Sequence, residues 1–186
     1  MNRTQLYLLG ILSIIILATS ACKKDDPFIP NEEELITTFT YTLTTSGAAP
    51  VVLSFTDLDG DGGNAPTING GTLQANTTYT GTLDLLNEAE SPSESITAEI
   101  AAEKEDHQFF FATDGLDLRF AYDDLDANQQ PVGLNTTLIT GDAGTGNLRI
   151  TLRHEPNKNA TGVSMGNIDN AGGETDIEVT FPITVQ

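Results

Sequence analysis

The stretch that most constrains the fold lies at the end of the chain, where apolar and polar side chains alternate. The apolar members are Ile177, Val179, Phe181, Ile183 and Val185, and the residues between them are Asp176, Glu178, Thr180, Pro182 and Thr184. Side chains two residues apart share one face of a β-strand, so this alternation predicts a strand with one buried and one solvated face. Pro182 has no amide donor, which predicts that the strand lies at a sheet edge or is bulged there.

Similar short segments recur along the chain and are separated by turn-forming residues. We expect about nine strands of this kind, over residues 34–45, 51–55, 79–87, 96–101, 107–112, 116–122, 132–140, 147–154 and 176–185. Segment 96–101 suits either a strand or a short helix, and no stretch favours a long helix. The pattern predicts an all-β fold, an Ig-like or related Greek-key antiparallel β-sandwich, with an up-and-down β-barrel as the alternative.

The start of the chain has the layout of a secretory signal. An apolar segment from Leu6 to Leu17 follows Arg3 and ends in small residues directly before Cys22. This segment resembles a bacterial lipoprotein signal, although Thr19 stands where Leu is usual. The resemblance implies that Cys22 is lipidated and becomes the first residue of the mature chain. The alternative is an ordinary signal peptide with an incidental cysteine.

The residues after the cysteine indicate where such a lipoprotein is sent. Lys24-Asp25-Asp26 resembles the export tag of surface lipoproteins of the Bacteroidota. The resemblance implies a lipid-anchored protein of the outer membrane that faces the cell exterior, with a periplasmic location as the alternative. We therefore expect a signal peptide over residues 1–21, a lipidated tether over 22–33 and one β-sandwich domain over 34–186.

The net charge of the mature chain restricts its partners. Arg3 is the only charged residue of segment 1–21, so the mature chain keeps 27 acidic and 7 basic side chains, a formal charge of −20. Such a chain repels nucleic acid and attracts cations. Cys22 is the only cysteine, which leaves no disulfide and no thiol nucleophile. Trp is absent and there are four Tyr, so a platform for stacking sugars is poorly supplied.

Four acidic or histidine-containing segments are predicted to meet at one end of the sandwich. Strands joined in sequence run alternately up and down, and these segments all follow even-numbered strands. They are Asp57–Asn64, Glu103–His107, Asp123–Asn128 and His154–Glu155. Segment 123–128 contains a weak repeat of an acidic loop, in Asp124, Asp126 and Asn128.

The two histidines of the chain are the predicted metal ligands. His107 shares its parity with Phe109 and Phe111, and His154 with Leu152, so both imidazoles should lean inward at the rim. The nearby carboxylates are Glu103, Glu105, Asp106 and Glu155. Histidine with carboxylate and no sulfur predicts a zinc site. The alternative is that each histidine ends a strand and forms local hydrogen bonds.

The loop after residue 56 resembles the first half of a calcium-binding loop. Asp57, Asp59 and Asp61 occupy alternate positions before Gly62, but Ile68 stands where the bidentate Glu of an EF-hand is needed. No helices are expected to flank the loop, so it is not an EF-hand. A calcium-stabilised loop with ligands from elsewhere is one interpretation, and a solvated acidic turn is the other.

The features together resemble a family of small surface lipoproteins of the Bacteroidota. Besides the lipoprotein start, the resemblance is carried by segments 59–64, 153–158 and 172–179, and it spans nearly the whole mature chain. It implies an accessory protein working beside an outer-membrane TonB-dependent transporter. Some members carry a label that refers to a periplasmic-binding fold, which the absence of alternating strands and helices contradicts.

No nucleophile motif is visible, so we expect a binding module rather than an enzyme. The leading hypothesis is capture of a divalent cation, zinc first, at the His107/His154 end. A structural or adhesive sandwich stabilised by calcium is the second hypothesis. A glycan-binding accessory protein is the third, and the missing Trp counts against it.

Overall fold

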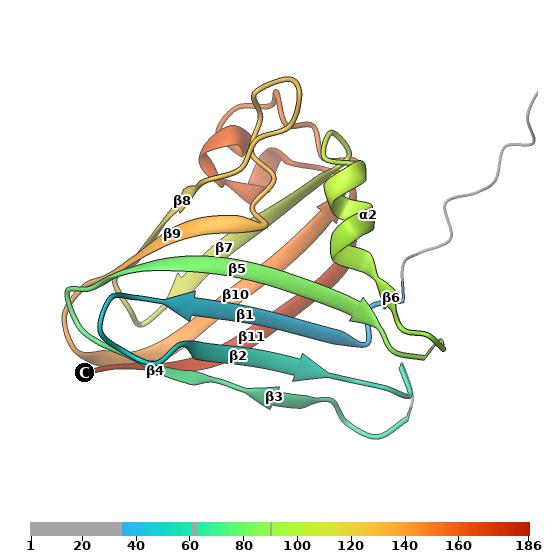
Figure 1. Ribbon diagram of the computed structural model, residues 1–186. Helices are drawn as coiled ribbons and strands as arrows, with labels where there is room; N and C mark the ends of the chain where they lie inside the picture. Colours follow the sequence, from blue (N-terminus) through green and yellow to red (C-terminus); the bar gives the residue numbers. More distant parts are fainter. Residues whose placement is uncertain (1–34, 61–62, 90) are drawn as a thin grey trace, which may run out of the picture. The chain divides into compact units, whose positions relative to one another are not determined.

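The computed structural model describes residues 35–60, 63–89 and 91–186, and Figure 1 shows their arrangement. These residues form two β-sheets and one short α-helix, which confirms the predicted all-β sandwich. The sheets of the described ranges do not close into a barrel. The predicted signal peptide and tether lie outside the described residues. No helix in the described part of the chain is both long enough and apolar enough to span a bilayer.

The first sheet, sheet A, contains seven strands in the order β3-β2-β1-β5-β9-β8, with β6 paired to β5. All of its pairings are antiparallel. The strands are β1 (Thr38–Thr44), β2 (Val51–Thr56), β3 (Thr67–Asn69), β5 (Thr78–Asn87), β6 (Glu94–Ser95), β8 (Leu118–Tyr122) and β9 (Asn135–Thr140). Figure 1 shows β3, β2, β1 and β5 side by side in front of the second sheet.

The second sheet, sheet B, contains four strands in the order β4-β11-β10-β7. They are β4 (Gly71–Leu73), β7 (His107–Asp114), β10 (Gly144–His154) and β11 (Glu174–Val185). The pairs β10/β11 and β10/β7 are antiparallel, whereas β11 pairs with β4 in parallel. The chain passes from sheet A to sheet B at Gly70, between β3 and β4.

The position of β11 differs from the prediction for Pro182. The strand lies inside sheet B rather than at its edge. The break in the β10/β11 register falls between Leu152 and Arg153, which face the start of β11, whereas Pro182 lies near the end of β11. A Cβ on Gly70 would lie 1.8 Å from the carbonyl oxygen of Pro182. The missing amide of Pro182 therefore faces the same side as that carbonyl, just before β4 begins, where no ladder bond is lost.

Segment 96–101, which suited either a strand or a helix, forms helix α2 (Ile96–Ala102). The Ser95 side chain accepts a hydrogen bond from the Ala98 amide and so caps the first turn. Ile96 and Ile100 are buried, which attaches the helix to the main core.

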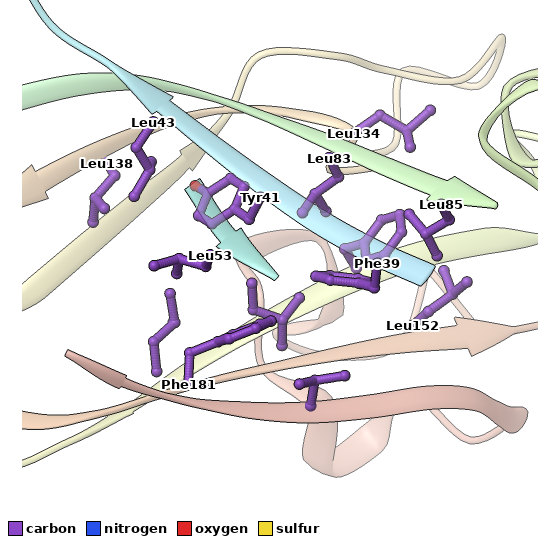
Figure 2. Close-up of a cluster of buried hydrophobic side chains, with 14 of the residues drawn as sticks. Phe39, Tyr41, Leu43, Leu53, Leu83, Leu85, Leu134, Leu138, Leu152 and Phe181 are labelled. Carbon is purple, nitrogen blue, oxygen red and sulfur yellow. The ribbon is translucent and has the colours of Figure 1, made fainter. Parts of the chain in front are cut away.

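The main core lies between the sheets and is built from the apolar positions of the predicted alternation. Figure 2 shows Phe39, Tyr41 and Leu83 of sheet A facing Phe181 of sheet B. The rings of Phe39 and Phe181 stack with centroids 5.9 Å apart. Burial of such side chains contributes roughly 1.5–3 kcal/mol each. The Tyr41 hydroxyl is satisfied inside the core by Thr136 Oγ1 at 2.7 Å.

A second, smaller cluster covers the outer face of sheet B. Phe110 points away from the main core and packs against Val163 and Ala171. Val163 and Ala171 belong to segment 155–173, which contains the 3₁₀ helices η1 (Val163–Met165) and η2 (Ile168–Asn170). The Gln108 side-chain amide donates to the Val163 carbonyl at 2.8 Å and holds the segment in place.

A buried ion pair joins three loops at the end of the sandwich that carries His107. Lys158 Nζ lies 3.1 Å from Asp126 Oδ2, and the two side chains are 5% and 1% exposed. The ammonium group also donates to the backbone carbonyl of Lys104. Burial lowers the pKa of Lys158, whereas hydrogen bonds from the Gln130 amide and from Lys158 outweigh burial and lower the pKa of Asp126.

Candidate functional site

The two histidines lie against each other at the rim of sheet B. The antiparallel register of β7 and β10 places His107 directly opposite His154. Their rings are nearly parallel, with centroids 4.8 Å apart and an angle of 7° between the planes. Both histidines therefore lie at one end of the sandwich, as predicted from the sequence.

His107 is enclosed by protein, and each of its ring nitrogens faces a different group. Its side chain is 1% exposed, and Nδ1 lies 3.1 Å from the Glu103 carbonyl oxygen. A carbonyl only accepts, so Nδ1 carries the proton and the neutral ring keeps its lone pair on Nε2. Nε2 makes no hydrogen bond within the described residues and lies 3.9 Å from Asp176 Oδ2. Burial lowers the pKa of His107, although the Glu103 carbonyl opposes this shift.

Asp176 was not among the predicted site residues. The alternation assigned it to the solvated face of the last strand, but its side chain is only 8% exposed. The β10/β11 register pairs Leu152 with Ile177 and Arg153 with Thr175, so Asp176 is the extra residue of a β-bulge. A bulge re-aims a side chain, and no pattern in the sequence marks its position.

The predicted carboxylate ligands do not gather around the histidine pair. Glu103 contributes its backbone carbonyl, while the Glu155 amide donates to the Asp106 carbonyl at 2.6 Å. The side chains of Glu103, Glu105, Asp106 and Glu155 are exposed, in contrast to His107.

The histidine pair itself also lacks the geometry of a chelating site. Ring lone pairs lie in the ring plane, so two stacked rings cannot direct both toward one ion. Over the described ranges, no group of three or more His, Cys, Asp or Glu residues could hold a metal ion. The structure thus joins two of the six predicted zinc ligands, and zinc binding stays a prediction.

The predicted calcium loop is partly held by its own side chains. Asp59 Oδ2 accepts from the Asn64 amide at 2.9 Å and from the Asn64 side chain at 2.8 Å, and these bonds lower the pKa of Asp59. Asp61 lies outside the described residues. Asp57 Oδ1 differs from Asp59, because it is buried and has no hydrogen-bond partner among the described residues.

The weak repeat of this loop, in segment 123–128, is a structural turn. The Asp124 carboxylate accepts from the backbone amides of Gly133, Leu134 and Asn135. Asp126 Oδ1 accepts from the amides of Asn128 and Gln130, and Asp126 Oδ2 pairs with Lys158. Both carboxylates are therefore committed to the fold.

A cavity connects the Asp57 loop with the start of β11. It has a volume of about 500 Å³ and lies between the end of β2 and the bulge. Its polar lining includes Asp57, Asp176 and Glu178, and its apolar lining includes Ile36, Phe55 and Ile177. Because Asp176 also lies beside His107, the cavity extends from the acidic loop to the carboxylate next to the histidine pair.

Comparison with known proteins adds no relative to this description. No family model, curated protein or solved structure matches the chain. The resemblance to small surface lipoproteins of the Bacteroidota stays a prediction from the sequence.

Proposed function

We propose that this protein is a non-enzymatic binding module that captures a divalent cation in the cavity between β2 and β11. The observation that carries the proposal is the buried Asp57 Oδ1, which lines the same cavity as Asp176 and has no hydrogen-bond partner among the described residues. Leaving a buried acceptor unsatisfied costs about 1–3 kcal/mol, and more for a charged group. A bound cation would remove this cost.

The electrostatics of the chain support a cation rather than an anion as the ligand. The formal charge of −20 on the mature chain raises the local concentration of cations and repels anions. Carboxylate oxygens are hard ligands that suit calcium, whereas His107 Nε2 behind Asp176 suits zinc. Calcium is therefore the first candidate for the cavity, and zinc the second.

The small number of protein ligands fits capture and release better than a permanent structural ion. Two carboxylates cannot complete the coordination shell of calcium, so a bound ion would keep water molecules. An ion held in this way exchanges with solvent. We place the module on the cell surface through a lipid on Cys22, and we take a TonB-dependent outer-membrane transporter as the partner that receives the ion.

Isothermal titration of the mature chain carrying Cys22→Ser tests the proposal, with calcium and zinc added separately after chelator treatment. Asp57→Asn and Asp176→Asn should each weaken binding by at least about tenfold, which corresponds to roughly 1.4 kcal/mol. Asp114→Asn removes the same charge at the opposite end of β7 and should leave the affinity unchanged.

Two results would contradict the cavity as the binding site. The first is binding only at millimolar concentration that Asp57→Asn does not alter. The second is zinc binding that His107→Gln with His154→Gln abolishes while both aspartate variants keep it, which would return the site to the histidine pair.

A further inference from the structure

The outer face of sheet A is a grid of hydroxyl groups. Outward positions on neighbouring strands pair Thr44 with Thr80 and Thr80 with Thr137 in one row. The hydroxyl-bearing residues of this face are Thr38, Thr40, Thr42 and Thr44 of β1, Ser54 and Thr56 of β2, Thr67 of β3, Thr78, Thr80 and Thr82 of β5, and Thr137 of β9. Strand geometry spaces them roughly 4.8 Å across strands and 6.8 Å along them.

Several of these hydroxyls are free to bind a ligand. Thr78, Thr80 and Thr82 are exposed, and within the described residues their side chains make no hydrogen bond. The Thr44 hydroxyl donates to the Thr80 carbonyl at 3.3 Å, a long bond that leaves its lone pairs available. The hydroxyl grid therefore offers both donors and acceptors to solvent.

A shallow hollow at one end of the grid is lined by hydroxyl residues alone. It has a volume of about 370 Å³ and is lined by Thr44, Thr45, Ser46, Thr78 and Thr80. No charged or aromatic residue contributes to its lining. A hollow of this composition can exchange hydrogen bonds with another hydroxyl-rich molecule but cannot pair with an ion.

The hollow end of the grid is uncharged, in contrast to the chain as a whole. Elsewhere on the face, Glu88 accepts from the Thr38 hydroxyl, Asp84 from Thr97 and Asp123 from Thr137, and Arg119 pairs with Asp117 at 2.8 Å, but none of these charged residues lines the hollow. The outer face of sheet B instead carries acidic and basic side chains, and segment 155–173 covers part of it. On a chain of formal charge −19, the uncharged hollow is a surface that a neutral partner can contact without desolvating carboxylates.

We propose that the hydroxyl grid binds an uncharged polysaccharide, with the hollow at Thr44 and Thr80 holding one sugar unit. Sugar hydroxyls both donate and accept, as threonine hydroxyls do. The face is open rather than enclosed, so a single small sugar would be held weakly and a polymer that crosses several strands would be held by many contacts. The absence of Trp excludes stacking on indole rings, and the grid supplies recognition by hydrogen bonds and bridging water instead.

Affinity electrophoresis and sedimentation of the mature chain carrying Cys22→Ser test this proposal. The probes are dextran, amylopectin, yeast mannan, xylan and, as an anionic polymer, alginate. We expect retention by at least one neutral polymer and none by alginate. Thr78→Val, Thr80→Val and Thr82→Val combined remove three hydroxyls at nearly constant volume and should weaken retention by at least about tenfold.

The matched control removes three hydroxyls from the outer side of sheet B, through Thr72→Val, Thr180→Val and Thr184→Val, and should leave retention unchanged. Thermal melts verify that each variant folds; if the triple grid variant does not, Thr80→Val alone should weaken retention and Thr80→Ser should restore it.

Three results would overturn the proposal. They are failure of every neutral polymer to bind, binding that the grid variant leaves intact, and self-association through the grid, seen as a dimer by light scattering, without any polysaccharide binding. The test is independent of cation capture, because Asp57→Asn should weaken cation binding and leave polysaccharide retention unchanged.

Discussion

Replacement of Lys158 by Met tests whether the buried ion pair holds the three loops at the His107 end. The variant keeps the apolar stem of the side chain and leaves the Asp126 carboxylate 1% exposed without its cation. Removing one partner of a buried pair costs about 3–5 kcal/mol. Two backbone amides still donate to Asp126 Oδ1, so we expect the lower end of that range, about 3 kcal/mol.

Urea unfolding and calorimetry of the mature chain carrying Cys22→Ser measure this loss. In a domain of this size each kcal/mol lowers Tm by roughly 2–4 °C, so Lys158→Met should lower it by roughly 6–12 °C. Adding Asp126→Asn to Lys158→Met removes the uncompensated charge and should recover part of the loss.

Arg119→Met supplies the matched control, because Arg119 and Asp117 form an ion pair at 2.8 Å with side chains that are 72% and 54% exposed. Its cost should stay below about 1 kcal/mol. The buried pair would not be a major stabiliser of the loops if Lys158→Met cost no more than Arg119→Met. The same conclusion would follow if the double variant were less stable than Lys158→Met by the full cost of a second buried polar defect.

Three further predictions concern the core and the histidine pair. Burial lowers the pKa of His107, so the stability that its neutral ring contributes is present above the unfolded pKa of about 6.5 and is lost as the pH falls through the folded pKa. Urea unfolding at pH 7.5 and pH 5 should show this loss of stability in the wild type and a smaller loss in His107→Gln. Gly81→Ala places a Cβ 2.4 Å from the Tyr41 hydroxyl oxygen and should cost about 1–3 kcal/mol, measured by calorimetry. Phe110→Ala should cost about 3–5 kcal/mol in urea unfolding, a loss that would be absent if segment 155–173 were not packed on sheet B.

The strands could be predicted because their signal is local and regular. Phe39, Tyr41 and Leu43 alternate with threonines, and the structure buries these apolar residues. The two three-residue strands β3 and β4 were missed because a strand of that length has too few residues to show a period. Counting strands gave residues 79–87 the direction of the first strand, but β5 runs antiparallel to β1. Segment 96–101 is a helix rather than the predicted strand, and this second difference restores the predicted direction of β7, so the histidines still meet at one end.

The candidate site could be predicted only in part. Strand parity predicted that His107 and His154 face inward at one end, but the sequence did not show that the two rings stack. The exposed side chains of Glu103 and Glu155 depend on the rotation of turns, which the sequence does not encode in a readable pattern. Asp176 was missed because a bulge reverses its face. The prediction that Pro182 marks a sheet edge or a bulge was wrong, because a proline fits this interior strand where Gly70, a residue far away in the chain, lies against it.

The place of β11 in sheet B affects when the domain can fold. This last strand lies between β10 and β4, and its parallel partner Leu73 is separated from Val185 by most of the domain. Pairings between such distant segments form slowly, because a long loop must close first. Sheet B is therefore completed only after the final residues have been synthesised. If residues 1–21 act as the predicted export signal, this delay would keep the domain unfolded while the chain crosses the membrane.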